Sequence, residues 1–187
     1  MSAEDPDGRD TLRQELRGTI IVAVALVGIL AAGWIGTRLV ARDTATLGPG
    51  VTITYGPGWG ENVIGPMGVW SHSRRIGQSV LNVSPRWESE SLEELLGVYR
   101  REVLDVRLPQ AVHDDPVMTE HAAGAALIQR WSARDPDGTL YRAELLVVAS
   151  GTTGVILDAR WPENEDPDVV AEIRRVMSSL QIEPLVP

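Results

Sequence analysis

The side chains that most often carry chemistry are few in this sequence and far apart. Its 187 residues include no Cys and three histidines, His72, His113 and His121. Without Cys there is no thiol nucleophile, thiolate metal site or disulfide, and three dispersed histidines have no metal-ligand spacing. Every basic residue is Arg, which excludes a Schiff-base lysine, and no Gly-x-Ser-x-Gly motif surrounds a serine. We therefore expect no catalytic residue, no metal and no cofactor.

A run of carboxylates between Glu163 and Asp168 is dense enough to suggest a calcium site. Its spacing lacks the glycine and the terminal glutamate of an EF-hand loop. A helix that begins at this point explains the run, because the helix dipole favours negative charge at its N-terminus. The sequence therefore predicts a helix start at this run.

Three residues are candidates for contact with a partner or ligand. Trp87 lies in a predicted loop between a strand and a helix, where a large ring is free to meet another molecule. Arg74 and Arg75 form the densest local positive charge in the expected outer domain and suit an acidic partner, although such a pair is commonly only a solvated loop. Because the chain has no Phe, most of its other tryptophans are expected to fill the core.

The overall charge limits the classes of partner. Seventeen basic and 26 acidic residues give a formal net charge of −9. Nucleic-acid binding needs basic density to neutralise phosphates and release their counterions. We therefore expect no nucleic-acid partner.

An uncharged apolar segment is the strongest single feature of the sequence. Residues 19–37 carry no charge, and a span over residues 19–41 is long enough to cross a hydrocarbon core of about 30 Å. Trp34 fits the interfacial belt at the far end. A cleaved signal peptide is the alternative, but the apolar run is longer than the usual signal core. The sequence predicts a transmembrane helix over residues 19–41 that anchors the chain in the lipid bilayer.

The residues before the span predict its orientation. Arg9, Arg13 and Arg17 precede the span, whereas Arg38 and Arg42 follow it, so the positive-inside rule favours a cytoplasmic N-terminus. Residues 1–18 are too short and too polar to bury a core and predict a disordered cytoplasmic tail. Residues 42–50 predict a short linker, and residues 51–187 predict an extracytoplasmic domain. The expected location is the cell membrane, with a single pass.

The outer domain alternates strand and helix patterns. Residues 91–103 and 166–180 each carry one apolar helical face, with Ser91 and Asp166 as N-cap residues and Pro167 at the first helical position. Period-2 or short apolar runs predict strands at 51–55, 68–73, 79–84, 117–121, 125–133, 140–150 and 155–161. The last three strands are separated by tight turns and predict an antiparallel meander. The fold class is α+β, an antiparallel sheet flanked by helices.

The opening ITYGPGW at residues 53–59, the long central hairpins and the closing helix with SSLQI at residues 178–182 resemble the PsbP-like α/β/α sandwich. Among bacterial proteins the pattern is most similar to the LpqN/LpqT-type actinobacterial envelope family. Members of that family are typically anchored through a lipidated Cys, which this chain lacks. The resemblance implies an accessory or binding role at the cell envelope without catalytic residues.

Three functional hypotheses follow. The first is a membrane-anchored extracytoplasmic interaction or accessory module with a protein partner in the envelope. A subunit of a larger membrane complex is one form of this role. The second is a carrier or sensor of a lipid or small apolar ligand, which requires a cavity lined by aromatic and aliphatic side chains. An enzyme is the least supported, because no nucleophile and base are paired in the sequence.

Overall fold

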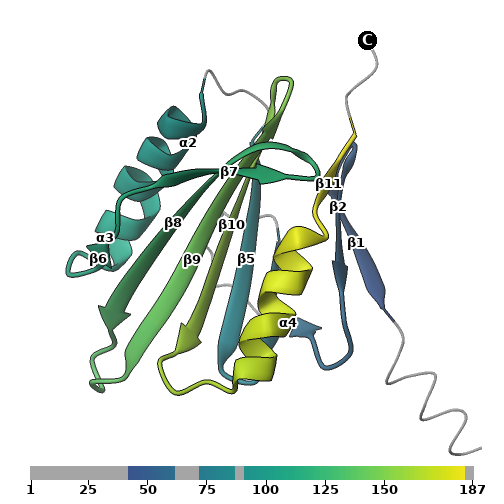
Figure 1. Ribbon diagram of the computed structural model, residues 1–187. Coiled ribbons are helices and arrows are strands. Elements are labelled where there is room, and N and C mark those ends of the chain that lie inside the picture. Colours follow the sequence, from purple (N-terminus) through teal and green to yellow (C-terminus); the bar gives the residue numbers. More distant parts are fainter. Residues whose placement is uncertain (1–41, 62–71, 87–90, 184–187) are drawn as a thin grey trace, which may run out of the picture. The chain divides into compact units, whose positions relative to one another are not determined.

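The computed structural model describes residues 42–61, 72–86 and 91–183 (Figure 1). The predicted tail (1–18) and transmembrane helix (19–41) lie outside these residues, as does Trp87. The chain divides into two units, Met1–Ala41 and Arg42–Pro187, and the described residues all belong to the second. Within the described ranges, no helix has the length and hydropathy needed to cross a membrane.

A large antiparallel sheet of eight strands organises the domain. Its strands are β3 (Gly60–Glu61), β4 (His72–Ile76), β5 (Ser79–Arg86), β6 (Val112–His113), β7 (Val117–His121), β8 (Gly124–Arg134), β9 (Leu140–Ser150) and β10 (Thr153–Pro162). They lie in the order β3-β4-β5-β10-β9-β8-β6, and β7 also pairs with β8. The predicted meander of β8, β9 and β10 is confirmed, with tight turns between its strands.

A second, three-stranded sheet consists of β1 (Asp43–Gly48), β2 (Val51–Tyr55) and β11 (Gln181–Ile182). Strand β2 lies in the middle of this sheet and was predicted with the same bounds. Residues 42–50 were predicted as a linker, but most of them form β1, which pairs with β2. This correction has a physical reason: Ala45 and Leu47 alternate with polar residues and pack against the core, as in a half-buried strand.

Two helical segments flank the large sheet. The first begins at α2 (Leu92–Tyr99) and continues through the π-helical turn η1 (Arg100–Leu104) and α3 (Asp105–Arg107). Its predicted cap is confirmed, because the Ser91 hydroxyl accepts a 3.1 Å hydrogen bond from the Glu94 N–H. The second is α4 (Pro167–Ser178), where the Asp166 carboxylate accepts from the Asp168 N–H at 2.9 Å.

The large sheet has a separate hydrophobic core on each face. On one face, Leu95 and Tyr99 of α2 pack with Leu145 and Ile156 of the sheet. On the other face, which we call the α4 face, α4 and the small sheet pack together against β5, β9 and β10. Figure 1 shows α4 lying across the near side of the large sheet, beside β2 and β11. The predicted sheet flanked by helices is therefore present, with a small sheet added beside α4.

Candidate functional site

A hollow of about 470 Å³ opens on the α4 face of the large sheet, at the ends of β8, β9 and β10. Helix α4 borders it on one side and β6 on the other. We call this hollow the arginine groove, and the side chains that characterise it are Val112, Arg130, Arg142, Glu144, Trp161 and Arg174. The groove therefore combines three arginines with the central Glu144 and the Trp161 ring, and Asp114 and Trp131 also line it.

Strand β9 shows how the sequence makes the groove. Its side chains on the α4 face are first charged, at Arg142 and Glu144, and then apolar, at Leu146 and Val148. The two apolar side chains belong to the core that α4 and the small sheet cover, whereas Arg142 and Glu144 line the groove. The same strand face thus changes from core to groove within a few residues.

Glu144 lies at the centre of the charged residues. Its side chain is only 5% exposed, and Arg174 of α4 donates to it from Nε at 3.1 Å and from Nη2 at 2.5 Å. Arg130 adds a 3.4 Å contact to the same carboxylate from the neighbouring strand. Hydrogen bonding to Glu144 raises the pKa of Arg174 above its ordinary value, so Arg174 stays charged. The carboxylate is buried with its compensating charge, as a buried anion requires.

The three guanidinium groups remain accessible despite these contacts. The side chains of Arg130, Arg142 and Arg174 are 65%, 62% and 54% exposed. Arg142 pairs outward with Glu163 at 2.6 Å, and the Arg174 guanidinium carbon lies 5.8 Å from the centre of the Trp161 ring. A planar guanidinium offers five N–H donors, so each arginine keeps donors for a further acceptor. The groove is chemically suited to carboxylates or other oxyanions.

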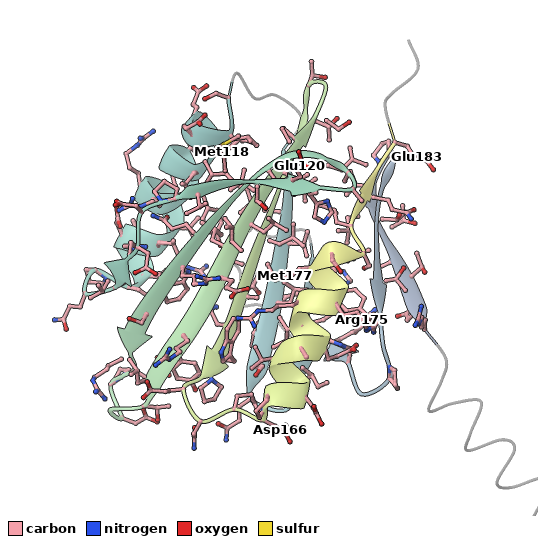
Figure 2. The ribbon with its side chains drawn as sticks, in the orientation of Figure 1. Met118, Glu120, Asp166, Arg175, Met177 and Glu183 are labelled. Atoms are coloured by element: carbon pink, nitrogen blue, oxygen red, sulfur yellow. The ribbon has the colours of Figure 1, made fainter. Side chains whose placement is uncertain are left out.

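An exposed apolar edge adjoins the groove. Among the described residues, the most exposed large hydrophobic side chains are Val106, Val112, Val117 and Met118. Val112 lines the groove from β6, and it is 68% exposed. Val117 and Met118 lie on β7, which pairs with β8 on the same side as β6. Figure 2 shows Met118 and Glu120 on this strand, away from Met177 and Asp166 of the α4 region.

A buried polar cluster lies on the opposite face of the large sheet. Asp158 of β10 is 1% exposed and accepts a 3.0 Å hydrogen bond from the Tyr99 hydroxyl. Burial raises the pKa of the Asp158 carboxyl, while Arg160, Tyr99, Trp131 and Asn82 lower it in part. The Arg160 Nε lies 3.9 Å from the carboxylate, too far for a hydrogen bond. A smaller pocket lies beside this cluster.

The structure separates the candidate residues of the sequence analysis. Arg74 and Arg75 lie on strand β4 instead of a loop, so their side chains point to opposite faces of the sheet. Arg74 is 16% exposed, donates to Asp43 at 3.1 Å and lies over the Tyr55 ring. Arg75 is exposed, on the face away from α4. The two arginines therefore do not act as one charged pair.

The arginine groove was not predicted from the sequence. Arg130, Arg142 and Arg174 come from three elements and have no local motif. A signal was present, however, in β9, where Glu144 interrupts an otherwise apolar run at 143–149. A carboxylate at such a position must be paired when the strand is buried, and this requirement points to arginines on neighbouring elements.

No metal site is found in the parts of the chain that the structure describes, where no three His, Asp or Glu side chains converge. His113 lies with its ring 6.4 Å from that of Trp131, and His121 contacts the Met177 carbonyl at 3.3 Å. These two histidines serve packing and hydrogen bonding between elements.

Comparisons with known proteins show the fold. No protein-family model matches the chain, and no curated protein matches it either. Among solved structures, the chain is similar to cyanobacterial PsbP (CyanoP) from Synechocystis sp., with 14% identity, a TM-score of 0.60, and coverage of 78% of this chain and 94% of that one.

Two further structures share the architecture. LpqN, which is involved in cell envelope biogenesis of Mycobacterium tuberculosis, gives 13% identity and a TM-score of 0.52, covering 82% of this chain and 96% of LpqN. The Ran-binding protein Mog1p of Saccharomyces cerevisiae gives 8% identity and a TM-score of 0.51, covering 76% and 96%. The chain has a PsbP-like fold that resembles LpqN, as the sequence predicted.

Proposed function

We propose that this protein is a non-enzymatic interaction module of the cell envelope, anchored in the membrane by residues 19–41, with its folded domain outside. It binds an acidic segment of a partner protein in the arginine groove. The observation that carries this proposal is the set of three half-exposed arginines around the buried Glu144.

The charge of the groove supports a protein partner with carboxylates. The chain as a whole has a net charge of −9, yet the described lining of the groove has three arginines against two acidic residues, Glu144 and Asp114. A local excess of cations on an acidic protein selects acidic partners and repels basic ones. Val112, exposed at the rim, adds apolar contact area next to the charges.

The polarity of the groove is what separates this proposal from a lipid carrier. A carrier needs walls of aliphatic and aromatic side chains around an acyl chain. Here the walls are guanidinium and carboxylate groups, and the Trp161 ring is only 6% exposed. The named role of LpqN in cell envelope biogenesis supports the envelope setting of the proposal.

Co-purification from mildly solubilised membranes tests the proposal. The full chain should retain a discrete protein partner, and the double variant Arg130→Gln with Arg142→Gln should lose it. These two changes leave Arg174 to compensate Glu144, so the fold should persist. Thermal unfolding checks that it does.

Two matched variants make the result specific. Arg101→Gln removes one exposed charge on the α2 side and should retain the partner. Arg75→Gln tests the contact that the sequence suggested. Loss of the partner in Arg75→Gln alone would move the contact to β4, and recovery of lipid without protein would favour the carrier.

A further inference from the structure

A second, smaller pocket lies on the face of the large sheet that carries α2. Its volume is about 180 Å³, and it opens beyond the end of α3 at the tips of β5, β8 and β9. Its walls are mainly apolar or aromatic, from Val80, Leu108, Trp131, Ala133 and Tyr141. The charged residues in the lining are one cation, Arg160, and one acidic residue, Asp135. Apolar walls with a few placed polar or charged groups are the usual composition of a small-molecule site.

Arg160 is half-buried, and its one ion pair, with Asp158 at 3.9 Å, is too long for a hydrogen bond. Its side chain is 30% exposed, and its guanidinium makes no hydrogen bond to any other described residue, with Nε buried and without a hydrogen-bond acceptor. Arg174 and Arg175, by contrast, each donate two or more hydrogen bonds to a carboxylate. A partly buried cation without hydrogen-bond acceptors has donors available for a ligand.

Asp158 accepts no hydrogen bond from these donors, although its Oδ1 has no hydrogen-bond partner. The Tyr99 hydroxyl donates to its Oδ2 at 3.0 Å, and Asn82 and Trp131 lie beside the carboxyl. Arg160 supplies charge from 3.9 Å without a hydrogen bond. The Arg160 guanidinium therefore lines the pocket with N–H groups that make no hydrogen bond.

We infer that this pocket binds a small carboxylate with an apolar body, such as an aromatic or short aliphatic acid, with the carboxylate paired to Arg160. The acid oxygens accept from the guanidinium, and the apolar body lies against Leu108, Val80 and Tyr141. This site lies on the opposite face of the sheet from the arginine groove and shares no charged residue with it, although Trp131 belongs to both linings. The Arg160 and Gln78 variants therefore distinguish binding here from binding in the groove.

Benzoate is the test ligand, with benzamide and benzylamine as neutral and cationic molecules of the same shape. The full chain in mild detergent is titrated while the indole N–H signal of Trp131 is followed by NMR, because Trp131 lines the pocket and its Nε1 is buried. Benzoate should shift this signal saturably, and the other two compounds should bind at least about tenfold more weakly, as the loss of an ionic hydrogen bond implies.

Three variants decide the assignment. Arg160→Gln should weaken benzoate binding roughly tenfold or more. Gln78→Trp, on the exposed turn that lines the pocket, should block binding without touching Arg160. Arg101→Gln, on the exposed side of η1, should bind as the parent does. Equal affinity for benzoate and benzamide, or benzoate binding unchanged in both Arg160→Gln and Gln78→Trp, would overturn the assignment. Because Gln78→Trp keeps every buried group, it decides the question even if Arg160→Gln fails to fold.

Discussion

The Tyr99 hydroxyl of α2 donates a 3.0 Å hydrogen bond to the carboxylate of Asp158 in the middle of the large sheet. Tyr99 is fully buried and Asp158 is 1% exposed, so this bond fixes the helix to the sheet inside the core. It also keeps a titratable group in an apolar environment. The stability of the protein should therefore depend on pH, in a direction that the pKa of Asp158 determines.

Stability should fall as the pH rises above the ordinary pKa of an aspartate. Burial raises the pKa of Asp158 above its usual value of 3.8, so the folded protein holds this proton more tightly than the unfolded chain does. The stabilisation is complete below that value and is lost as the pH passes through the raised pKa. Asp158→Asn should remove this part of the slope in pH-dependent chemical unfolding of the full chain.

The control for this prediction is Tyr99→Phe, which removes the donor and keeps the ring. In this variant the loss of stability should extend to higher pH, because a carboxylate with one fewer hydrogen bond has a higher pKa. Glu172 affects stability in the opposite direction. Its hydrogen bonds with Arg175 lower the pKa of Glu172, so its contribution to stability is lost as the pH falls. An identical slope in the parent and in Asp158→Asn would show that Asp158 does not titrate in this range.

Trp59 should stabilise the domain without taking part in binding. Its ring centre lies 5.3 Å from that of Tyr55, and its indole N–H donates to Glu172 at 3.2 Å. The ring is half-buried against the core on the α4 face. Trp59→Ala should therefore cost about 3 kcal/mol or less, at the lower end for buried tryptophans.

Chemical unfolding measures this cost, with Trp59→Phe as the control. The Phe variant keeps the ring stacking and loses only the hydrogen bond, about 1 kcal/mol. If Trp59→Ala left stability unchanged and released the protein partner, the ring would instead be a contact surface.

The parts of the fold that could be predicted from the sequence are those determined by a few neighbouring residues. The strand Val51–Tyr55 and the Ser91 cap were predicted because period-2 alternation and the cap spacing lie within a few residues. The strand predicted at 68–73 was ended too early, because Arg74 and Arg75 suggested a loop, whereas β4 continues to Ile76; residues 68–71 lie outside the described residues. The polarity of these two arginines is explained only by the fold, in which Arg74 packs on Tyr55 from another sheet.

The arginine groove and the Asp158 cluster were not predictable in this way, because their residues come from elements that are far apart in the chain. Glu144 of β9 and Arg174 of α4 form a hydrogen bond although 30 residues separate them in the chain. Asp158 and Asn82 are directly opposite each other on neighbouring strands. No local pattern fixes such register. What the sequence did carry was the presence of single carboxylates in apolar strands.

Strand β1 should be needed for the stability of the folded domain. It pairs with β2 along Asp43–Gly48, and Ala45 and Leu47 cover part of the core. A fragment of residues 42–187 should unfold cooperatively, whereas a fragment of residues 49–187 loses these contacts and exposes the edge of β2. We expect a loss of about 1–3 kcal/mol from the two side chains.

Thermal unfolding of the two fragments measures this difference. At roughly 2–4 °C per kcal/mol for a chain of this size, the shorter fragment should melt several degrees lower. Equal melting temperatures would show that residues 43–48 behave as the linker that the sequence predicted.

The predicted orientation in the membrane is tested by cysteine labelling, because the chain has no Cys. A cysteine at Thr152, exposed in the β9–β10 turn, should react with a membrane-impermeant maleimide on intact cells. A cysteine at Ser2 should react only after the membrane is opened. The reverse pattern would place the domain in the cytoplasm.

The most direct test of the arginine groove as the partner site is site-specific photocrosslinking in intact cells. A benzoylphenylalanine at Val112, 68% exposed at the groove, is compared with the same group at Val106, 69% exposed on α3. The full chain carrying it at Val112 should form one discrete protein adduct, whose crosslinked peptide is rich in Asp and Glu. Arg130→Gln with Arg142→Gln should abolish that adduct. An equal adduct from Val106, or adducts with lipid alone, would contradict the proposed function.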